Sequence, residues 1–258
     1  MASVKLALSP SFNANESLLR AAENGSLQGV KTALNAGADI EFEHRNSALS
    51  NTGTALFIAS LEGHVDIVRL LLRKGASVLK RTTGEFTILH AAASEGKTAV
   101  VELLVNHGAT LDVRDGFQNT PLMVACGNNH VDTVRRLIEL GARPDLTDGY
   151  IAKRLGLEDG NYPAACVESI KLIQDARNTK LLRCCNPKCG KPGYRSTLKL
   201  CARCKLTRYC SRDCQAQHWS VGHKKCCGQD ACSDVGPETF KKLVKLLPDG
   251  IREHVSPP

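Results

Sequence analysis

The chain of 258 residues is long enough for one large domain or two smaller ones. Its composition, 42% hydrophobic and 23% charged, is ordinary for a soluble protein, and no stretch approaches the roughly 18 to 20 apolar residues that span a bilayer. The first ten residues are too weakly apolar for a signal peptide. We therefore expect an intracellular protein, in the cytoplasm, the nucleus or both, where clustered cysteines bind metal more often than they form disulfides.

A period of 33 residues runs through residues 16–177. It is carried by recurring threonines, leucines, alanines and Gly-Ala pairs, namely Thr54, Thr87, Thr120, Leu56, Leu89, Leu122, Ala59, Ala92, Ala125, Gly75, Gly108 and Gly141. An earlier Gly-Ala pair at Gly37 is offset by 38 residues, which indicates about five inserted residues around 43–51. Self-similarity at such a period is typical of stacked repeat architectures.

The motifs Thr87-Ile88-Leu89-His90 and Glu62-Gly63-His64-Val65, with Leu70–Ala76, resemble ankyrin repeats. The resemblance implies that each unit is a turn followed by two antiparallel helices, with the recurring glycines ending the second helix in a left-handed conformation. We expect about four repeats plus a degenerate capping unit within 15–178, after a flexible N-terminus at 1–14. A final helix over 164–175, with Val167, Ile170 and Ile173 on its apolar face, should cover the open end of the stack.

The repeat half shows no catalytic signature, and its regularly placed Thr and His side chains are interpreted as hydrogen-bonding the turns. We therefore predict a binding surface along the turn tips, around 81–86 and 114–118, and on the concave helix face. Phe86 and Phe117 are apolar residues at these turns. They are either partner contacts or local packing.

Nine of the twelve cysteines fall between Cys184 and Cys227. Together with one histidine they form four closely spaced pairs: Cys184 or Cys185 with Cys189, Cys201 with Cys204, Cys210 with Cys214, and His223 with Cys227. Gaps of two to four residues let both members of a pair reach one zinc ion, and four pairs suffice for two tetrahedral sites. Segments this small generally need a metal to fold, so we expect two structural Zn²⁺ ions to supply the folding free energy.

The run from Tyr209 to Gln215, followed by Trp219, His223 and Cys227, resembles the MYND zinc finger over residues 184–227. The resemblance implies interleaved ligand pairs: Cys184, Cys189, Cys210 and Cys214 for one zinc, with Cys185 as the alternative to Cys184, and Cys201, Cys204, His223 and Cys227 for the other. It also implies a short proline-rich peptide bound beside Gln215 and Trp219. The alternative for Trp219 is that it packs as the core of the module.

Two connecting segments complete the chain. The junction at 177–180 is short and polar, so we expect the zinc module to be held close to the last repeat. In the tail, 228–258, the spacing of Phe240, Leu243, Val244 and Leu247 predicts an amphipathic helix over 238–247. This helix either packs on the zinc module or docks a partner.

The sequence thus predicts a mainly α-helical protein: an ankyrin-repeat solenoid, a small interleaved two-zinc MYND module and a C-terminal helix. The expected function is a non-enzymatic protein-protein interaction adaptor, with the stack binding one partner and the finger binding a proline-rich segment of another. The alternative is an E3 ubiquitin ligase or its substrate-recruiting subunit. The 12 Lys and Arg against one acid, Asp213, in 180–227 allow at most weak nucleic-acid binding. No membrane span is expected, and the oligomeric state is open.

Overall fold

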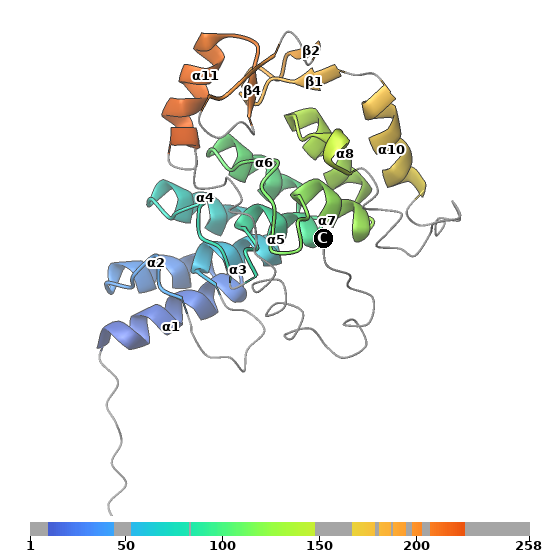
Figure 1. Ribbon diagram of the computed structural model, residues 1–258. Helices are drawn as coiled ribbons and strands as arrows, with labels where there is room; N and C mark the ends of the chain where they lie inside the picture. The colour runs from blue at the N-terminus through green and yellow to red at the C-terminus, as the bar shows by residue number, and fades with distance from the viewer. Residues whose placement is uncertain are drawn as a thin grey trace, which may run out of the picture.

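The computed structural model describes residues 10–43, 53–82, 84–147, 167–178, 181–186, 188–194, 198–202 and 207–224. Over these ranges the chain forms a stack of helix pairs followed by a small cysteine-rich module (Figure 1). None of the helices in these ranges is long and apolar enough to cross a membrane. The tail helix that the sequence predicts at 238–247 lies outside the described residues.

The stack consists of four successive helix pairs: α1 (Pro10–Glu23) with α2 (Leu27–Asn35), α3 (Ala55–Glu62) with α4 (Val65–Arg73), α5 (Ile88–Ser94) with α6 (Thr98–Asn106), and α7 (Pro121–Gly127) with α8 (Val131–Leu140). The first helices of the pairs contact one another in sequence, and so do the second helices. Helix α1 begins at Pro10, ahead of residue 15 where the sequence placed the start of the repeats. Proline suits the first helical turn because its missing N–H has no intrahelical partner there.

The periodic threonines begin the first helix of the second, third and fourth pairs. The Oγ1 atoms of Thr54, Thr87 and Thr120 accept hydrogen bonds from backbone N–H groups three residues later, at 3.3, 3.4 and 3.3 Å. This is the N-cap arrangement, which satisfies donors that have no partner inside the helix. The structural interpretation of these threonines is therefore confirmed.

The periodic leucines and alanines form the core. Leu56, Leu89 and Leu122 are at most 2% exposed, and the alanines at the corresponding positions, Ala59, Ala92 and Ala125, are fully buried. Alanine at these positions lets the first helices of neighbouring pairs approach closely, as the contacts of α3 with α5 and of α5 with α7 require. Burying each leucine contributes roughly 1.5 to 3 kcal/mol relative to leaving it exposed.

A short cap covers the last pair. The 3₁₀ turn η1 (Pro144–Thr147) and helix α10 (Val167–Asn178) pack together, and α10 also packs on α8. Ile170 and Ile173 are buried as the sequence predicts, at 6% and 2% exposure. Val167 is 50% exposed, because it lies in the first turn of α10.

The cysteine-rich module contains little regular structure. Strand β1 (Leu181–Arg183) pairs antiparallel with β2 (Pro192–Tyr194), and β3 (Lys199–Leu200) pairs with β4 (Arg208–Tyr209). Helix α11 (Arg212–His218) follows and continues into a π-helical turn, η3 (Trp219–His223). Ladders of two or three residues cannot hold a domain together. The module therefore depends on side-chain contacts, and its core cluster consists of Cys184, Cys185, Cys201, Tyr209 and Cys214 with Trp219 packed against it.

The module lies against the end of the stack, as the short junction predicts. A Cβ atom added to Gly141, at the end of α8, would lie 3.3 Å from the carbonyl oxygen of Arg183 in β1. Asp112, in the turn after α6, is only 3% exposed and interacts electrostatically with Arg208 of β4. The repeat stack and the module therefore share an interface.

Candidate metal centre and interaction surfaces

Four cysteine sulfurs converge at one point of the module. Cys184 follows β1, Cys189 lies in the turn before β2, Cys210 follows β4, and Cys214 lies in the first turns of α11. Their Sγ atoms all lie within 4.8 Å of one another, although the residues come from four separate segments. The structure thus brings together the first set of ligands that the resemblance implied.

The spacing of these sulfurs fits a zinc ion. The Sγ of Cys210 lies 3.6 Å from that of Cys189 and 3.5 Å from that of Cys214, far beyond the roughly 2.05 Å of a disulfide bond. Four sulfurs at about 2.3 Å from a central zinc would be separated by about 3.8 Å in a tetrahedron. Burial raises the pKa of the Cys184 thiol, so the thiolate form that zinc needs would depend on the positive charge of the ion.

The structure separates Cys184 from its neighbour Cys185. The Sγ of Cys185 accepts a hydrogen bond from the backbone N–H of Arg208 at 3.3 Å, and its own N–H donates to the carbonyl of Arg208 at 2.7 Å. The backbone N–H of Cys184 is held instead by the carbonyl of Lys191, at 3.0 Å, beside the turn that carries Cys189. Geometry therefore brings the Cys184 sulfur, and not that of Cys185, into the four-sulfur cluster.

Only half of the second ligand set falls in the part of the chain that the structure describes. Cys201 is 1% exposed and His223 is fully buried, whereas Cys204 and Cys227 lie outside the described residues. The Nε2 of His223 lies 3.3 Å from the hydroxyl of Thr207. This contact fixes the orientation of the imidazole ring inside the module.

The sequence reasoning missed the turn that shapes the first ligand pair. Asn186 is 1% exposed, and its carbonyl accepts hydrogen bonds from Cys189 and Gly190 at 2.9 and 3.1 Å. Its side-chain oxygen accepts from the N–H of Lys188 at 3.1 Å, and its side-chain nitrogen donates to Gln217 of α11 at 2.9 Å. The Asn-Pro dipeptide between the cysteines was a usable signal, because asparagine favours such turns.

Aromatic side chains fill the rest of the module. The hydroxyl of Tyr209 lies 2.9 Å from Nδ1 of His218, and the rings of His218 and His223 stack at 5.2 Å. Burial, together with the nearby His223, lowers the pKa of His218 to about 4. His218 is therefore a neutral core residue, packed between Tyr209 and His223.

The two residues expected to read a peptide remain accessible. Gln215 and Trp219 are both half-buried and lie four residues apart, one turn along α11 and η3. The Trp219 ring meets His223 edge-on, with centroids 5.8 Å apart. Trp219 thus packs on the core on one side while leaving part of its surface exposed.

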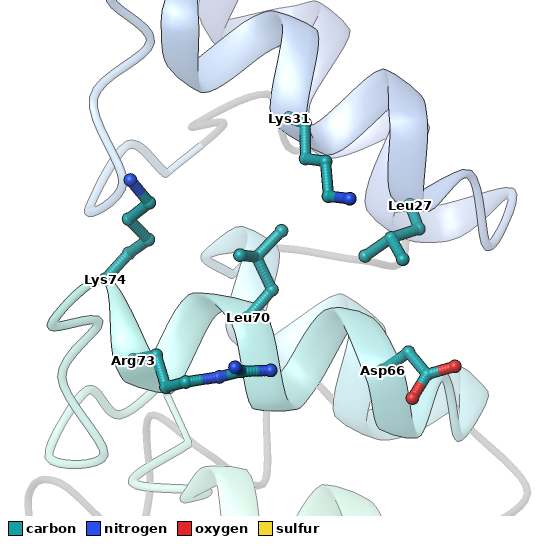
Figure 2. Close-up of a pocket in the computed structure, with 6 residues that line it drawn as sticks. All are labelled: Leu27, Lys31, Asp66, Leu70, Arg73 and Lys74. Atoms are coloured by element: carbon teal, nitrogen blue, oxygen red, sulfur yellow. The ribbon is translucent and has the colours of Figure 1, made fainter.

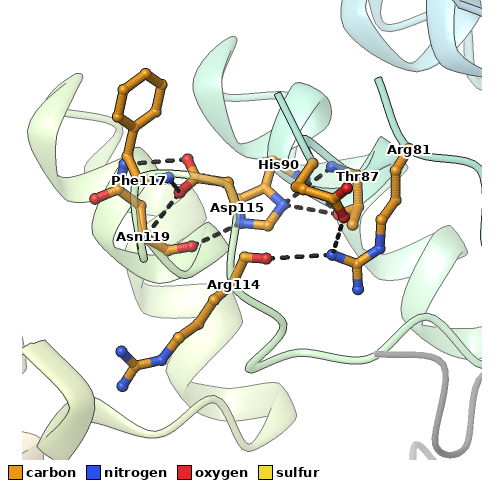
Figure 3. A network of polar contacts seen from close by, with 8 residues as sticks. Arg81, Thr87, His90, Arg114, Asp115, Phe117 and Asn119 are labelled. Carbon is orange, nitrogen blue, oxygen red and sulfur yellow. Dashed lines mark hydrogen bonds and ion pairs between the residues drawn. The ribbon is translucent and has the colours of Figure 1, made fainter. Parts of the chain in front are cut away.

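The turn tips of the stack are joined by a polar network (Figure 3). The Nδ1 of His90 accepts from the N–H of Thr87 at 3.2 Å, so its proton lies on Nε2, which donates to the carbonyl of Asn119 at 2.9 Å. Asp115 accepts from the N–H groups of Asn119 and Phe117, at 2.8 and 2.9 Å. Burial lowers the pKa of His90 to about 4, which keeps the ring neutral in this network.

The two phenylalanines of the turns differ. Phe86 lies over the imidazole of His90, with ring centroids 5.0 Å apart, and packs against the core. Phe117 is half-buried, and its ring points away from the polar network (Figure 3). Neighbouring tips are bonded directly, since the N–H of Gly116 donates to the carbonyl of Gly84 at 2.9 Å. Phe86 therefore provides local packing, and Phe117 is the ring presented at the tips.

Known families match both halves of the chain. The model for ankyrin repeats in three copies matches residues 18–115 and 79–148, which together cover just over half of the chain. The model for the MYND finger matches residues 184–227. Both are protein-interaction modules.

Among curated proteins, ubiquitin carboxyl-terminal hydrolase 19 of Arabidopsis thaliana is 45% identical over 49 residues, which are 19% of this chain and 7% of the hydrolase. Ubiquitin C-terminal hydrolase 15 of Oryza sativa subsp. japonica is 59% identical over 29 residues, or 11% of this chain and 3% of the hydrolase. The chain therefore spans less than a tenth of the length of each of these relatives, and the match does not extend their hydrolase activity to this chain.

The 33-residue period, the capped helix pairs and the four-sulfur cluster agree with these matches. The chain belongs to the ankyrin-repeat family and carries a MYND-type zinc finger after the repeats.

Proposed function

We propose that this chain is a non-enzymatic adaptor whose ankyrin stack binds one protein and whose MYND finger binds a proline-rich segment of another. Two structural zinc ions would fold the finger, held by Cys184, Cys189, Cys210 and Cys214 and by Cys201, Cys204, His223 and Cys227. Eight ligands fill two tetrahedral ions and leave no position for a reacting water. The metal is therefore proposed to organise the peptide site and to take no part in chemistry.

The exposed flank of Trp219 carries the proposal for the finger. A partly exposed indole next to the accessible amide of Gln215 offers an aromatic platform and a hydrogen-bonding group on one helical face. Proline-rich segments are extended and poor in internal hydrogen bonds, so they suit such a platform. Nearby in the chain, Val221 is 40% exposed and adds apolar surface to the same turn.

Replacing Trp219 by alanine tests this site. Binding of the full chain to a library of proline-rich peptides should weaken at least tenfold, while the zinc content stays at two ions per chain. Replacing Val167, an exposed apolar residue on α10 outside the finger, by alanine is the control and should change nothing. Unchanged peptide binding by the Trp219→Ala protein would leave Trp219 with a packing role only.

The turn tips support the proposal for the stack. They are fixed relative to one another by the Gly116 to Gly84 hydrogen bond and by the bond from Arg81 Nη1 to the carbonyl of Arg114 at 3.3 Å. A preformed surface of this kind loses little conformational entropy on binding. Phe117 and Arg114 would then be contact residues.

The non-enzymatic part of the proposal has its own assay. His90, a side chain able to act as a base, is fully buried and occupied by hydrogen bonds to Thr87 and Asn119. Incubating the zinc-loaded protein with ubiquitin, a ubiquitin-activating enzyme and conjugating enzymes should yield no polyubiquitin chains. Zinc-dependent chain formation would instead establish the ligase alternative.

A further inference from the structure

A groove opens on the outer face of the stack, between the second helices of the first two repeats. It has a volume of about 660 Å³ and is lined by Leu27 and Lys31 of α2, by Asp66, Leu70 and Arg73 of α4, and by Lys74 just beyond α4 (Figure 2). This volume lies within the range of roughly 300 to 1,000 Å³ that is usual for ligand sites. The groove lies on the second helices, away from the turn tips assigned above to the stack's partner.

The floor and the walls of the groove differ in character. Leu27 and Leu70 are half-buried and face each other across the two helices (Figure 2). Lys31 reaches from α2 into the space between Leu70 and Leu27, and the guanidinium of Arg73 extends along α4 beside Leu70 (Figure 2). The groove therefore combines two apolar side chains with cations.

These cations have no acidic partner within the described residues. Lys31, Arg73 and Lys74 are exposed and form no salt bridge there. The nearest charge of opposite sign in the lining is Asp66, two helical turns before Arg73 on α4. The groove therefore has a basic end at Arg73 and Lys74 and an acidic end at Asp66.

The other half of the same outer face provides a comparison. On α8, Arg136 is paired with Glu102 at 2.8 Å and with Glu139 at 3.0 Å. Arg135 is paired with Asp132 at 2.8 Å and with Glu168 at 3.3 Å. The arginines of α8 are thus paired with carboxylates, whereas Lys31, Arg73 and Lys74 of the groove have no such partner in the part of the chain that the structure describes.

We propose that this groove docks an acidic peptide segment of a partner protein, one that places a bulky apolar side chain against Leu27 and Leu70. Its carboxylates would lie over Lys31, Arg73 and Lys74. The lining of α4 from Asp66 to Lys74 measures about 12 Å at 1.5 Å per residue, which is roughly two helical turns of a bound segment. Asp66 would orient the segment by repelling acidic residues from its own end of the groove.

Two segments of the chain itself carry the wrong charge for this groove. Residues 1–9 contain Lys5 and no acid, and 238–247 contain Lys241, Lys242 and Lys245 against Glu238 alone. Like charges would repel both segments from the groove. The occupant is assigned to another protein, independently of the function proposed for the finger and the turn tips.

A displayed library of random 12-residue peptides tests the proposal. The library is selected on the zinc-loaded full chain after removal of peptides that also bind the doubly substituted chain R73E/K74E. The recovered peptides should be rich in Asp and Glu and contain at least one large apolar residue. In fluorescence polarisation they should bind the double variant and K31E at least tenfold more weakly. Their affinity should also fall several-fold between 0.1 and 1 M salt, as the Debye length falls from about 10 to 3 Å.

The matched control is R135E on α8, an exposed arginine of the same outer face that is already paired. It should bind the recovered peptides within twofold of the unaltered chain, and all variants should keep the same circular dichroism spectrum. Three results would overturn the proposal: recovered peptides without an excess of acid, equal binding by R73E/K74E, or a dimer in light scattering that R73E/K74E abolishes. The last would make a second copy of the chain the occupant.

Discussion

Replacing Cys184 by serine is expected to weaken zinc binding, whereas the same change at Cys185 is expected to leave the affinity for zinc unchanged. Only the Cys184 sulfur lies in the cluster whose four sulfurs are within 4.8 Å of one another. Zinc binding to zinc-finger peptides is worth about 10 to 16 kcal/mol in total, so each of four ligands accounts for about 3 kcal/mol. Losing one ligand should therefore weaken zinc binding roughly a hundredfold, since 1.4 kcal/mol corresponds to a factor of about ten.

The change at Cys185 should cost far less. Its sulfur accepts a hydrogen bond from the N–H of Arg208 at 3.3 Å, and a serine hydroxyl can accept the same bond. The expected loss of stability is about 1 kcal/mol, the usual contribution of one hydrogen bond. Serine at Cys126, a buried cysteine of α7, is the control for introducing a hydroxyl far from the cluster.

Cobalt titration provides the measurement, because sulfur-to-cobalt charge transfer absorbs in the near ultraviolet in proportion to the number of bound thiolates. The Cys185→Ser and Cys126→Ser proteins should give the full absorbance and compete equally with a chelator. The Cys184→Ser protein should give a weaker band and release its metal at a hundredfold lower chelator concentration. Equal losses at positions 184 and 185, or full retention by Cys184→Ser, would refute the assignment of the cluster.

Three other measurements follow from the fold. Gly96→Ala should lower the free energy of unfolding by about 2 to 3 kcal/mol in urea denaturation, because Gly96 has φ +65° and its new Cβ would lie 2.5 Å from Nδ1 of His130. Gly75 has φ +93° and open space around the position of an added Cβ, so Gly75→Ala should lower the free energy of unfolding only through backbone strain, by about 1 to 2 kcal/mol. A loss equal to that of Gly96→Ala would contradict the packing argument. By NMR the imidazole of His90 should stay neutral from pH 8 to pH 5, because its pKa is lowered from 6.5 to about 4. Between pH 4 and 6.5 the unfolded state binds more protons than the folded state, so this group adds stability as the pH rises through that range. Titration of His90 near pH 6.5 would contradict its burial. Chelation of zinc should unfold 184–227 while far-ultraviolet circular dichroism retains the helices of the stack, and loss of both together would show that the repeats depend on the module.

The pH dependence of overall stability would not isolate His90. Burial raises the pKa of Asp112 from 3.8 to about 7. The hydrogen bond from the backbone N–H of Arg143 and the positive charges of Arg143 and Arg208 lower this pKa but do not offset the effect of burial. The folded state then holds this proton more tightly than the unfolded state. Asp112 therefore removes stability as pH rises from about 4 to 7, opposite in sign to His90. Following the His90 resonances individually avoids this cancellation.

The repeat half could be predicted from the sequence because its determinants are local and periodic. Thr87 caps a helix and Gly141, with φ +108°, ends one, and both act within a few residues of their own position. The core leucines repeat every 33 residues because each pair packs chiefly on its neighbours. By contrast, the exposure of Val167 depended on where α10 begins, which residue spacing alone does not fix.

The zinc module could be predicted only in part. Spacing allowed either Cys184 or Cys185 to be the first ligand, since both are within reach of Cys189. The choice depends on the pairing of Cys185 with Arg208, a partner 23 residues away. The groove between α2 and α4 was not foreseen either, because whether Arg73 is paired depends on the neighbouring repeats and cannot be read from its own helix.

The contact of each helix pair with its immediate neighbours has a consequence for how the amount of this protein in the cell affects its function. The strongest contacts of each helix pair are with its neighbours, so binding at the first two repeats is expected to leave the sites on the zinc module unaffected. An adaptor with independent sites joins its partners best at intermediate abundance. When it is in excess, each partner occupies a different copy. With the adaptor function proposed above, overproduction of this chain should therefore mimic its loss.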